Sequence, residues 1–459
     1  MTKYLILGAA LALAACAGEP RDLPVAEIDC RTGLYRSAEG DVVSLTPTST
    51  GGYRWRKPDG TTGAVTQSGD GWTSTRGWTE EGDGTEIVLG ACDAQQIELG
   101  PQGALVAYAR APLEVQDVTF EHDGLTFAGR LIWPAGVERA PLAVHIHGSE
   151  RWSSVRSNAT PYLLAAEGIA SFVYDKRGTG QSEGKYTQDF HVLASDAIAA
   201  LEQARSLAGD RITRAGFVGG SQGGWIGPLA ASQTPVDFVV ALYGMAEGPL
   251  AEDRAQVMLD VANAGFGAEE QARAAELSDA AGVIMASDFK SGFREFDAVR
   301  NRYKNEPWYD AVEGEFTGEM LPHHEIALRL IGPFHDVGTS WEYDPMPVLR
   351  GLEAPQFWVI AAEDKEAPPE ETIRRIRTLQ GEGRPIDLAI YPNADHSMVL
   401  LEPGPDGDPR RVGQVRDYFR QIAAWINARD LSFAQNAGAE VHAAGEAAAQ
   451  AAPEQTPAP

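Results

Sequence analysis

Apolar residues follow two different patterns along the chain, and the first covers residues 28–112. There they come in short runs, such as Val42–Leu45 and Tyr53–Arg56, separated by turn sequences such as Lys-Pro-Asp-Gly at 57–60. Short strands broken by turns of this kind are typical of all-β domains. We therefore predict a small β-rich domain over residues 28–112. Its tryptophans are explained more simply as sheet or core residues than as a carbohydrate- or partner-binding face.

The second pattern begins at residue 113 and alternates strands with helices. Residues 115–120 and 125–133 form a candidate hairpin, and buried-looking strands with intervening helices follow it. Strands that alternate with helices indicate a mostly parallel sheet with helices on both faces. The sequence therefore predicts an α/β domain over residues 113–430. The expected strands after the hairpin are 142–146, 170–174, 216–218, 238–242, 356–361 and 386–391, and the expected helices are 160–168, 188–207, 370–380 and 412–427.

Residues 244–344 interrupt this alternation. They contain three helical patterns, at 251–264, 269–286 and 293–303, between two expected strands of the sheet. A helical cap inserted into the α/β domain is the natural interpretation.

The two ends of the chain differ from the rest. A lysine precedes an apolar run from Tyr4 to Ala15, too short to span a bilayer but suited to a signal peptide. Leu13-Ala-Ala-Cys16 resembles a bacterial lipobox, so we expect residues 1–16 to be a lipoprotein signal peptide with Cys16 lipidated, followed by a tether at 17–27. The alternative is an ordinary secretory signal. Because Ala17 is not aspartate, the expected location is the periplasmic face of the outer membrane. Residues 431–459 are rich in Ala, Gln, Glu and Pro and predict a disordered tail.

The net charge and the cysteines bear on the binding partners and on the cross-links of the protein. The net charge is −27, from 38 basic and 65 acidic residues, which disfavours nucleic-acid binding because phosphate contacts need Lys and Arg. Cys30 and Cys92 remain if Cys16 carries lipid. A pair of cysteines in an exported protein predicts a disulfide within the β-rich domain, and two unpaired buried thiols are the alternative.

The candidate chemistry centres on the stretch Gly219-Gly-Ser-Gln-Gly223, which follows an apolar strand and precedes a helix-compatible run. This is the sequence form of a nucleophile elbow, in which small residues let the strand and the helix approach around a strained serine. The prediction is that Ser221 is a nucleophile. A glycine-rich turn that happens to contain a serine is the alternative.

A serine nucleophile needs a general base, and the base needs an orienting carboxylate. His396 follows the expected strand at 386–391 and is our candidate base. Asp364 follows the strand at 356–361 and is our candidate acid, with Glu363 and Glu366 as alternatives. Asp395 is adjacent to the histidine, so we expect its side chain to point away from the imidazole.

Two backbone N–H groups are expected to hold the oxyanion. One belongs to Gln222, directly after the nucleophile, and the other to Ser149, where Gly148 allows the turn. His145 and His147 could be metal ligands, but no further ligand pattern accompanies them, and we expect no metal. Three other residues have expected roles: Asp175 and Arg177 in holding a loop near the site, and Trp225, with aromatic residues of the cap, in forming a wall of an apolar acyl pocket.

Three motifs together resemble a known family. They are His-Gly-Ser at 147–149, Tyr-Asp-Lys-Arg-Gly-x-Gly-x-Ser at 174–182 and Gly-Gly-Ser-Gln-Gly-Gly at 219–224. From about residue 113 to 430 the chain resembles bacterial α/β-hydrolase esterases with an extra N-terminal domain, related to dienelactone hydrolases and to prolyl-oligopeptidase-type domains. The resemblance implies a triad of Ser221, Asp364 and His396 that works without a cofactor.

The expected function is therefore hydrolysis of a small carboxylic ester through an acyl-enzyme. A peptidase or amidase on the same triad is one alternative, although the N-terminal segment is far too short for a propeller. A non-catalytic envelope binding protein is the other alternative.

Overall fold

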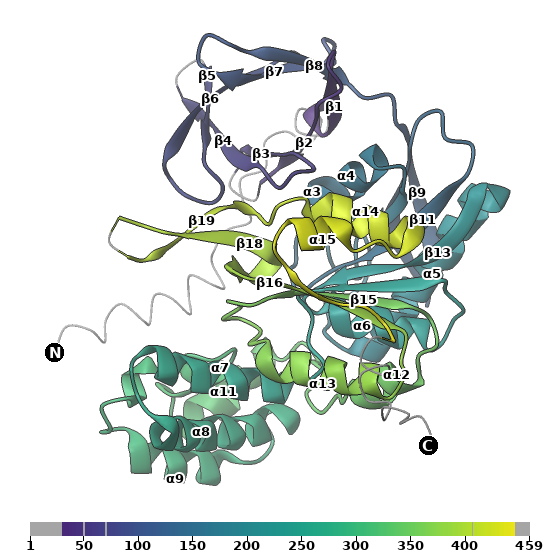
Figure 1. Cartoon of the computed structure of the whole chain (residues 1–459). Coiled ribbons are helices and arrows are strands. Elements are labelled where there is room, and N and C mark those ends of the chain that lie inside the picture. The colour runs from purple at the N-terminus through teal and green to yellow at the C-terminus, as the bar shows by residue number, and fades with distance from the viewer. Residues whose placement is uncertain (1–29, 49–50, 69–70, 406, 446–459) are drawn as a thin grey trace, which may run out of the picture.

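The computed structural model describes residues 30–48, 51–68, 71–405 and 407–445. It contains an N-terminal β-barrel, a large mixed sheet covered by helices on both faces, and a separate helical cap (Figure 1). The predicted fold class is confirmed. The expected signal peptide, Cys16 and the tether lie outside the described residues. Within the described ranges, no helix combines the length and apolar character needed to cross a bilayer.

The barrel is closed and antiparallel, with neighbouring strands joined in chain order and the last strand paired to the first. Closure leaves no open sheet edge, which is how a small all-β domain avoids pairing with other chains. Alternate residues such as Val43, Leu45 and Trp55 fill its interior. Cys30 and Cys92 are joined by a disulfide, with their Cα atoms 5.4 Å apart. The strands are β1 (Gly33–Ser37), β2 (Val42–Pro47), β3 (Tyr53–Arg56), β4 (Thr62–Ser68), β5 (Gly71–Thr75), β6 (Gly82–Leu89), β7 (Gln96–Pro101) and β8 (Val106–Arg110).

The central sheet has nine strands in the order β20-β16-β15-β14-β13-β11-β12-β10-β9. The six strands from β16 to β12 are parallel, and the antiparallel strands lie at the two edges. The parallel strands are nearly continuous apolar runs because helices bury both of their faces. The strands are β9 (Glu114–His122), β10 (Leu125–Trp133), β11 (Ala140–Ile146), β12 (Ala170–Tyr174), β13 (Ile212–Gly220), β14 (Phe238–Leu242), β15 (Gln356–Ala361), β16 (Ile386–Tyr391) and β20 (Glu440–His442).

Two layers of helices cover the sheet. Adjacent residues of β13 show the division, because Phe217 packs with α5 and α6 on one face while Val218 packs with α4 and α14 on the other. Leu34 and Val42 of the barrel belong to the same hydrophobic cluster as Val218, α4 and α14. The barrel therefore sits over the α4 side of the sheet (Figure 1). The helices are α3 (Ser154–Ser157), α4 (Thr160–Ala166), α5 (Phe190–Ala208), α6 (Gly223–Ala231), α12 (Met346–Gly351), α13 (Glu370–Gly381), α14 (Tyr418–Ala428) and α15 (Ser432–Asn436), with 3-10 turns at Gly209–Arg211 and His396–Met398.

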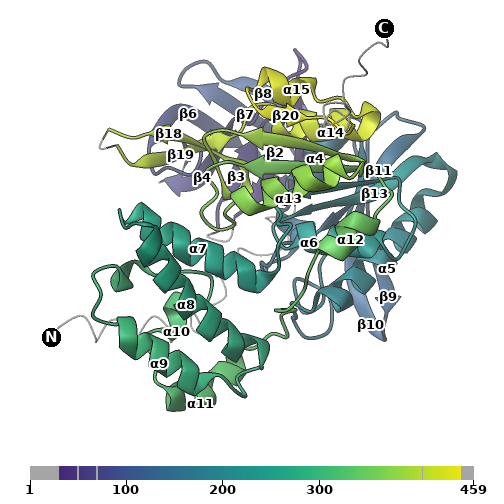
Figure 2. The ribbon, with the colours of Figure 1, turned by 60° about the horizontal axis from the view of Figure 1, so that its bottom comes forward.

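The cap is inserted between β14 and β15 and has a hydrophobic core of its own. Figure 2 shows its helices as a group beside the sheet. The buried carboxylate of Asp253 ties the group together, because it accepts hydrogen bonds from the Ser278 hydroxyl and from the backbone N–H groups of Phe316 and Thr317. The cap helices are α7 (Pro249–Asn263), α8 (Ala268–Ala286), α9 (Phe293–Tyr303), α10 (Thr317–Met320) and α11 (Glu325–His335), with a 3-10 turn at Tyr309–Ala311.

The prediction of a disordered tail from residue 431 is wrong for residues 431–445. Helix α15 and strand β20 lie in this segment, and β20 pairs antiparallel with β16 at the edge of the sheet. Ala434 is fully buried, and the backbone N–H of Ala444 donates to Asp387. Strand pairing uses backbone groups, so a segment with few large apolar residues can still be ordered. Residues 446–459 lie outside the described part of the chain.

A small sheet follows the loop that carries His396. It consists of β17 (Ala394–Asp395), β18 (Val399–Pro403) and β19 (Pro409–Gln414), so the expected helix at 412–427 begins only at Tyr418. Strands β18 and β19 reach to the barrel, where Trp78 N–H donates to Arg411 O and Gln414 N–H donates to Gly60 O. The loop that carries His396 therefore leads directly into β18 and β19, the strands that contact the barrel.

Candidate active site

The turn between β13 and α6 places Ser221 in a left-handed backbone conformation, with φ of 52°. A non-glycine residue in this region is strained, as a nucleophile elbow requires. The two flanking glycines are needed because a Cβ atom on Gly219 would lie 2.4 Å from the carbonyl oxygen of Gly223. The Ser221 N–H is held by Leu242 O at 3.0 Å, which fixes the turn to the neighbouring strand. The local geometry is that of an elbow.

His396 and Asp364 come together from the loops after β16 and β15. His396 Nδ1 lies 2.8 Å from Asp364 Oδ2, and only 3% of Asp364 is exposed. Asp364 Oδ1 accepts the backbone N–H groups of Glu366 and Ala367 at 3.0 and 2.8 Å. Burial of the imidazole opposes its protonation, but the hydrogen bond and charge of Asp364 outweigh burial and raise the pKa of His396 above its ordinary value.

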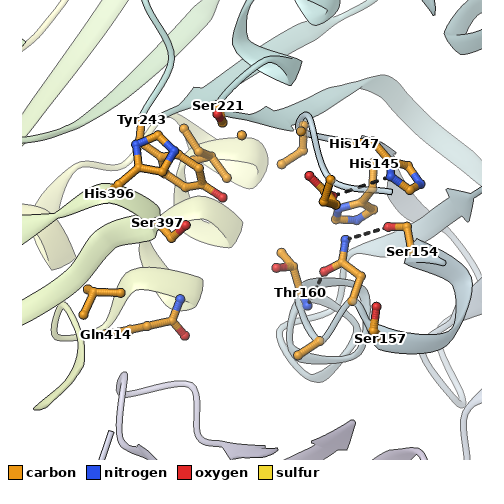
Figure 3. Close-up of a pocket in the computed structure, with 18 of the residues that line it drawn as sticks. His145, His147, Ser154, Ser157, Thr160, Ser221, Tyr243, His396, Ser397 and Gln414 are labelled. Carbon is orange, nitrogen blue, oxygen red and sulfur yellow. Dashed lines mark hydrogen bonds and ion pairs between the residues drawn. The ribbon is translucent and has the colours of Figure 1, made fainter. Parts of the chain in front are cut away.

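Ser221 and His396 line one cavity of about 590 Å³. Figure 3 shows Ser221 between Tyr243 and His396 on one side and His147 on the other. The Tyr243 ring meets the imidazole edge-on, with centroids 4.9 Å apart. Within the described residues no hydrogen bond joins Ser221 to His396, and such contacts often tighten only when substrate binds.

Within the described part of the chain, the other candidate acids form no hydrogen bond or ion pair with Nδ1 of His396. Glu363 is exposed. Glu366 is largely exposed, and its Oε1 is 3.7 Å from Nε2 of His396, the nitrogen that faces away from Asp364. Asp395 accepts the backbone N–H of His396, and its other oxygen lies 3.5 Å from Nε of Arg411. Asp364 is therefore the carboxylate that orients the imidazole through Nδ1.

The two expected oxyanion donors have free backbone N–H groups. Gln222 is the N-cap residue of α6, and neither its N–H nor that of Ser149 donates to any atom of the described residues. The carbonyl of Ser149 accepts the Tyr186 hydroxyl, and the carbonyl of Gly148 accepts Lys176 Nζ, so the loop is held from behind. Ser149 lines the cavity together with Ser221.

Residues 143–415, more than half of the chain, match the model of the alpha/beta hydrolase family. The chain belongs to the alpha/beta hydrolase family. A search of curated proteins found no match. Similar solved structures include an esterase of Pyrococcus furiosus, with 16% identity, a TM-score of 0.39 and coverage of 62% of this chain and 84% of that one.

Two further structures are similar at the same low level. The protein Est1E of Butyrivibrio proteoclasticus, solved with ferulic acid bound, has 18% identity and a TM-score of 0.36 over 61% of this chain and 90% of that one. The acylaminoacyl peptidase of Pyrococcus horikoshii has 13% identity and a TM-score of 0.40 over 77% of this chain and 52% of that one.

The paired histidines of this hydrolase have separate polar partners. His145 Nε2 lies 3.0 Å from Ser171 Oγ, and burial lowers the pKa of His145 to about 3. His147 Nε2 lies 2.9 Å from Tyr174 O, and burial lowers its pKa as well. Burial thus disfavours the charged form of both imidazoles, and each has a polar partner within the protein at Nε2.

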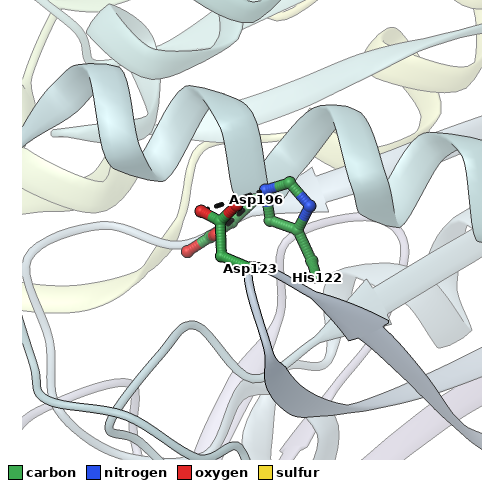
Figure 4. A group of neighbouring side chains, drawn as sticks. All are labelled: His122, Asp123 and Asp196. Carbon is green, nitrogen blue, oxygen red and sulfur yellow. Dashed lines mark ion pairs between the residues drawn. The ribbon is translucent and has the colours of Figure 1, made fainter.

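One group of side chains in the described residues has the spacing of metal ligands. His122, Asp123 and Asp196 bring their ligand atoms within 4.8 Å of one another (Figure 4). The Arg177 guanidinium already occupies this position, because its Nε donates to Asp196 at 2.7 Å and its Nη2 is 3.5 Å from Asp123. The group is therefore an ion-pair network centred on Arg177.

Asp175 and Arg177 have the contacts of loop-holding residues. Asp175 accepts hydrogen bonds from the Ser153 hydroxyl and from the backbone N–H groups of Val155 and Gln181. These bonds fix the turn after β12 against the segment that leads into α3.

The expectation that Trp225 and the cap form the acyl pocket is wrong for the cavity that contains Ser221. Trp225 is 6% exposed, stacks on Phe190 with centroids 5.0 Å apart, and donates its indole N–H to Glu247 O. It points into the core on the α5 side of the sheet because α6 buries that face. The residues that line the cavity include none from the cap.

Sequence reasoning missed the real source of the cavity wall. Arg56 and Trp78 of the barrel and Arg411 and Gln414 of β19 line the cavity that contains Ser221. No local pattern marks these residues as functional, because their proximity to Ser221 depends on how the barrel docks.

Proposed function

We propose that this alpha/beta hydrolase cleaves carboxylic esters through an acyl-enzyme formed on Ser221. The observation that carries the proposal is the buried 2.8 Å contact between Asp364 and His396, in a cavity that also contains a serine held at a strained turn. A serine needs an oriented general base to act as a nucleophile at neutral pH.

In the proposed reaction, Ser221 Oγ attacks the ester carbonyl carbon while His396 Nε2 accepts the hydroxyl proton. The N–H groups of Gln222 and Ser149 hold the negative oxygen of the tetrahedral intermediate. The intermediate collapses as the C–O bond to the alcohol breaks, and His396 returns its proton to the leaving oxygen. Water then attacks the acyl-enzyme by the same route and releases the carboxylic acid with free Ser221.

The test is an assay of the full chain, purified in mild detergent, with p-nitrophenyl esters of increasing acyl length and with aminoacyl p-nitroanilides. Ser221→Ala should reduce ester turnover by about a thousandfold or more. Ser232→Ala is the matched control, because Ser232 is exposed at the end of the same helix. An equally active Ser221→Ala protein would refute the assignment.

The anilide arm separates the ester from the amide reaction. Release from esters alone supports the esterase proposal, whereas Ser221-dependent release from anilides would replace it with a peptidase or amidase. Absence of turnover on both series, in a folded protein, would favour a non-catalytic binding role.

We also propose that the enzyme is anchored in the cell envelope by lipid on Cys16. The support is the lipobox-like sequence that ends in this cysteine. Cys16→Ser should move the protein from the membrane fraction to the soluble fraction of cells. Unchanged membrane association of that variant would refute the lipid anchor.

A further inference from the structure

The cavity that contains Ser221 extends from the sheet to the barrel. Its wall near the sheet includes Ser221 and His396, and its barrel wall includes Arg56 and Trp78. Arg411 and Gln414 of β19 line it as well. At about 590 Å³ the cavity has the size of a small-molecule site. Residues of the barrel therefore line the same cavity that a ligand of Ser221 would occupy.

The barrel wall carries positive charge at Arg56, and Arg54 lies close behind it on the same strand. Arg56 is partly buried, its Nη1 donates to Thr46 Oγ1 at 3.2 Å, and no carboxylate of the described residues lies within 4.0 Å of its guanidinium. Arg54, two residues earlier on β3, donates to Gly77 O and lies 4.3 Å from the centroid of Trp78. Burial, aided by the neighbouring arginine, lowers the pKa of Arg56 to about 9. A nearby anion would relieve this repulsion.

The acidic groups of the cavity do not neutralise that wall. Glu150 Oε1 lies 3.5 Å from His147 Nδ1, and Glu366 Oε1 lies 3.7 Å from His396 Nε2, so both are at the end near Ser221. Arg411 has one carboxylate neighbour, Asp395, at 3.5 Å from its Nε. In a chain with a net charge of −27, this leaves a cationic end of the cavity without a matching acid at Arg56.

The position of this wall is fixed by contacts between the barrel and β18–β19. Arg76 Nη2 donates to both carboxylate oxygens of Glu402, at 2.9 and 2.8 Å, and Trp78 N–H donates to Arg411 O at 2.8 Å. Because β18 follows the His396 loop directly, these contacts also fix the positions of Arg56 and Arg411 relative to His396.

We propose that Arg56 and Arg411 bind an anionic group of the substrate, a carboxylate or a phosphate, on the part of the ester remote from the scissile carbonyl. Guanidinium groups suit this role because their planar N–H donors match both anions. The N-terminal barrel is then a specificity element of the active site. The inference rests on the proposed ester hydrolysis at Ser221.

The test compares p-nitrophenyl half-esters of succinic, glutaric and adipic acid with the uncharged p-nitrophenyl alkanoates of equal chain length. We expect kcat/KM to favour the charged member of at least one pair by about tenfold. Arg56→Gln and Arg411→Gln should bring this ratio towards one, mainly through KM, and Arg56→Lys should retain part of it. Arg36→Gln is the matched control, because Arg36 is an exposed arginine of the same barrel outside the cavity.

An unchanged ratio in both glutamine variants, or a preference for the uncharged ester at every length, would overturn the inference. If Arg56→Gln fails to fold by circular dichroism, Arg411→Gln and Arg56→Lys decide. Inhibition of the wild type by glutarate but not by phenyl phosphate would identify the anion as a carboxylate, and the reverse result would identify a phosphate.

A binding measurement keeps this inference separate from the proposed function. Calorimetric titration of Ser221→Ala protein with the glutarate half-ester should show binding that weakens about tenfold when Arg56→Gln is added. If no ester is cleaved by the wild type but this binding is found, the esterase proposal fails and the anion site stands. If neutral esters are cleaved but the half-ester does not bind, only the anion site fails.

Discussion

Replacing Asp364 by asparagine tests the central geometry of the site, because the structure dictates how the new amide must lie. Oδ1 of Asp364 accepts two backbone N–H groups, from Glu366 and Ala367. An amide NH₂ at that position would face two donors, so the carbonyl oxygen of asparagine must remain there. The NH₂ group is then directed at His396 Nδ1, 2.8 Å from the present Oδ2.

That orientation forces the wrong tautomer of the imidazole. A donor facing Nδ1 requires Nδ1 to be unprotonated, which places the proton on Nε2 and removes the lone pair that should accept the Ser221 proton. Loss of the base in this way costs about 10³- to 10⁴-fold in kcat, which corresponds to about 4–5.5 kcal/mol of transition-state stabilisation.

The assay is ester hydrolysis over pH 5–9 by the wild type and by Asp364→Asn, with thermal unfolding measured to show that both are folded. In the wild type, only neutral His396 is active, and its raised pKa places the acid limb above the ordinary histidine value of about 6.5. Without the Asp364 charge, residual activity should have its acid limb at lower pH. A loss below about tenfold, or an acid limb that does not move, would refute the assignment of Asp364 as the orienting acid.

Three further experiments extend these tests. Glu366→Gln should move the acid limb to lower pH by less than Asp364→Asn does, because its carboxylate also raises the pKa of His396; an unmoved limb would contradict this. Gly219→Ala should lower the free energy of unfolding in urea by about 1–3 kcal/mol. Gly227→Ala should raise it by about 0.5–1 kcal/mol, because the nearest atom to a Cβ atom at Gly227 would be 3.7 Å away. Equal effects of the two substitutions would show that the elbow is not crowded. Removing the Cys30–Cys92 disulfide, which closes a span of 62 residues, should destabilise the barrel by up to about 4 kcal/mol in denaturant unfolding; an unchanged midpoint would refute a stabilising role.

Much of the architecture was predictable because its signals are local. The period of apolar residues distinguishes strands from helices, and the glycines around Ser221 follow from the small space between β13 and α6. The hydrolase order of serine, acid and histidine indicated the loops after β15 and β16. The choice among the carboxylates near residue 364 needed coordinates, since neighbouring side chains in one loop point in different directions.

The sequence by itself therefore determined the alternation of elements, the elbow and the loops that carry Asp364 and His396. Only the tertiary structure decided that Trp225 faces the core, that the segment after residue 431 adds an edge strand, and that Arg56 and Arg411 line the same cavity as Ser221. Periodicity and turn chemistry act over a few residues, whereas these outcomes depend on surfaces far apart in the chain that pack together. Such contacts arise from the summed shape and burial of many side chains, which no single stretch of sequence encodes.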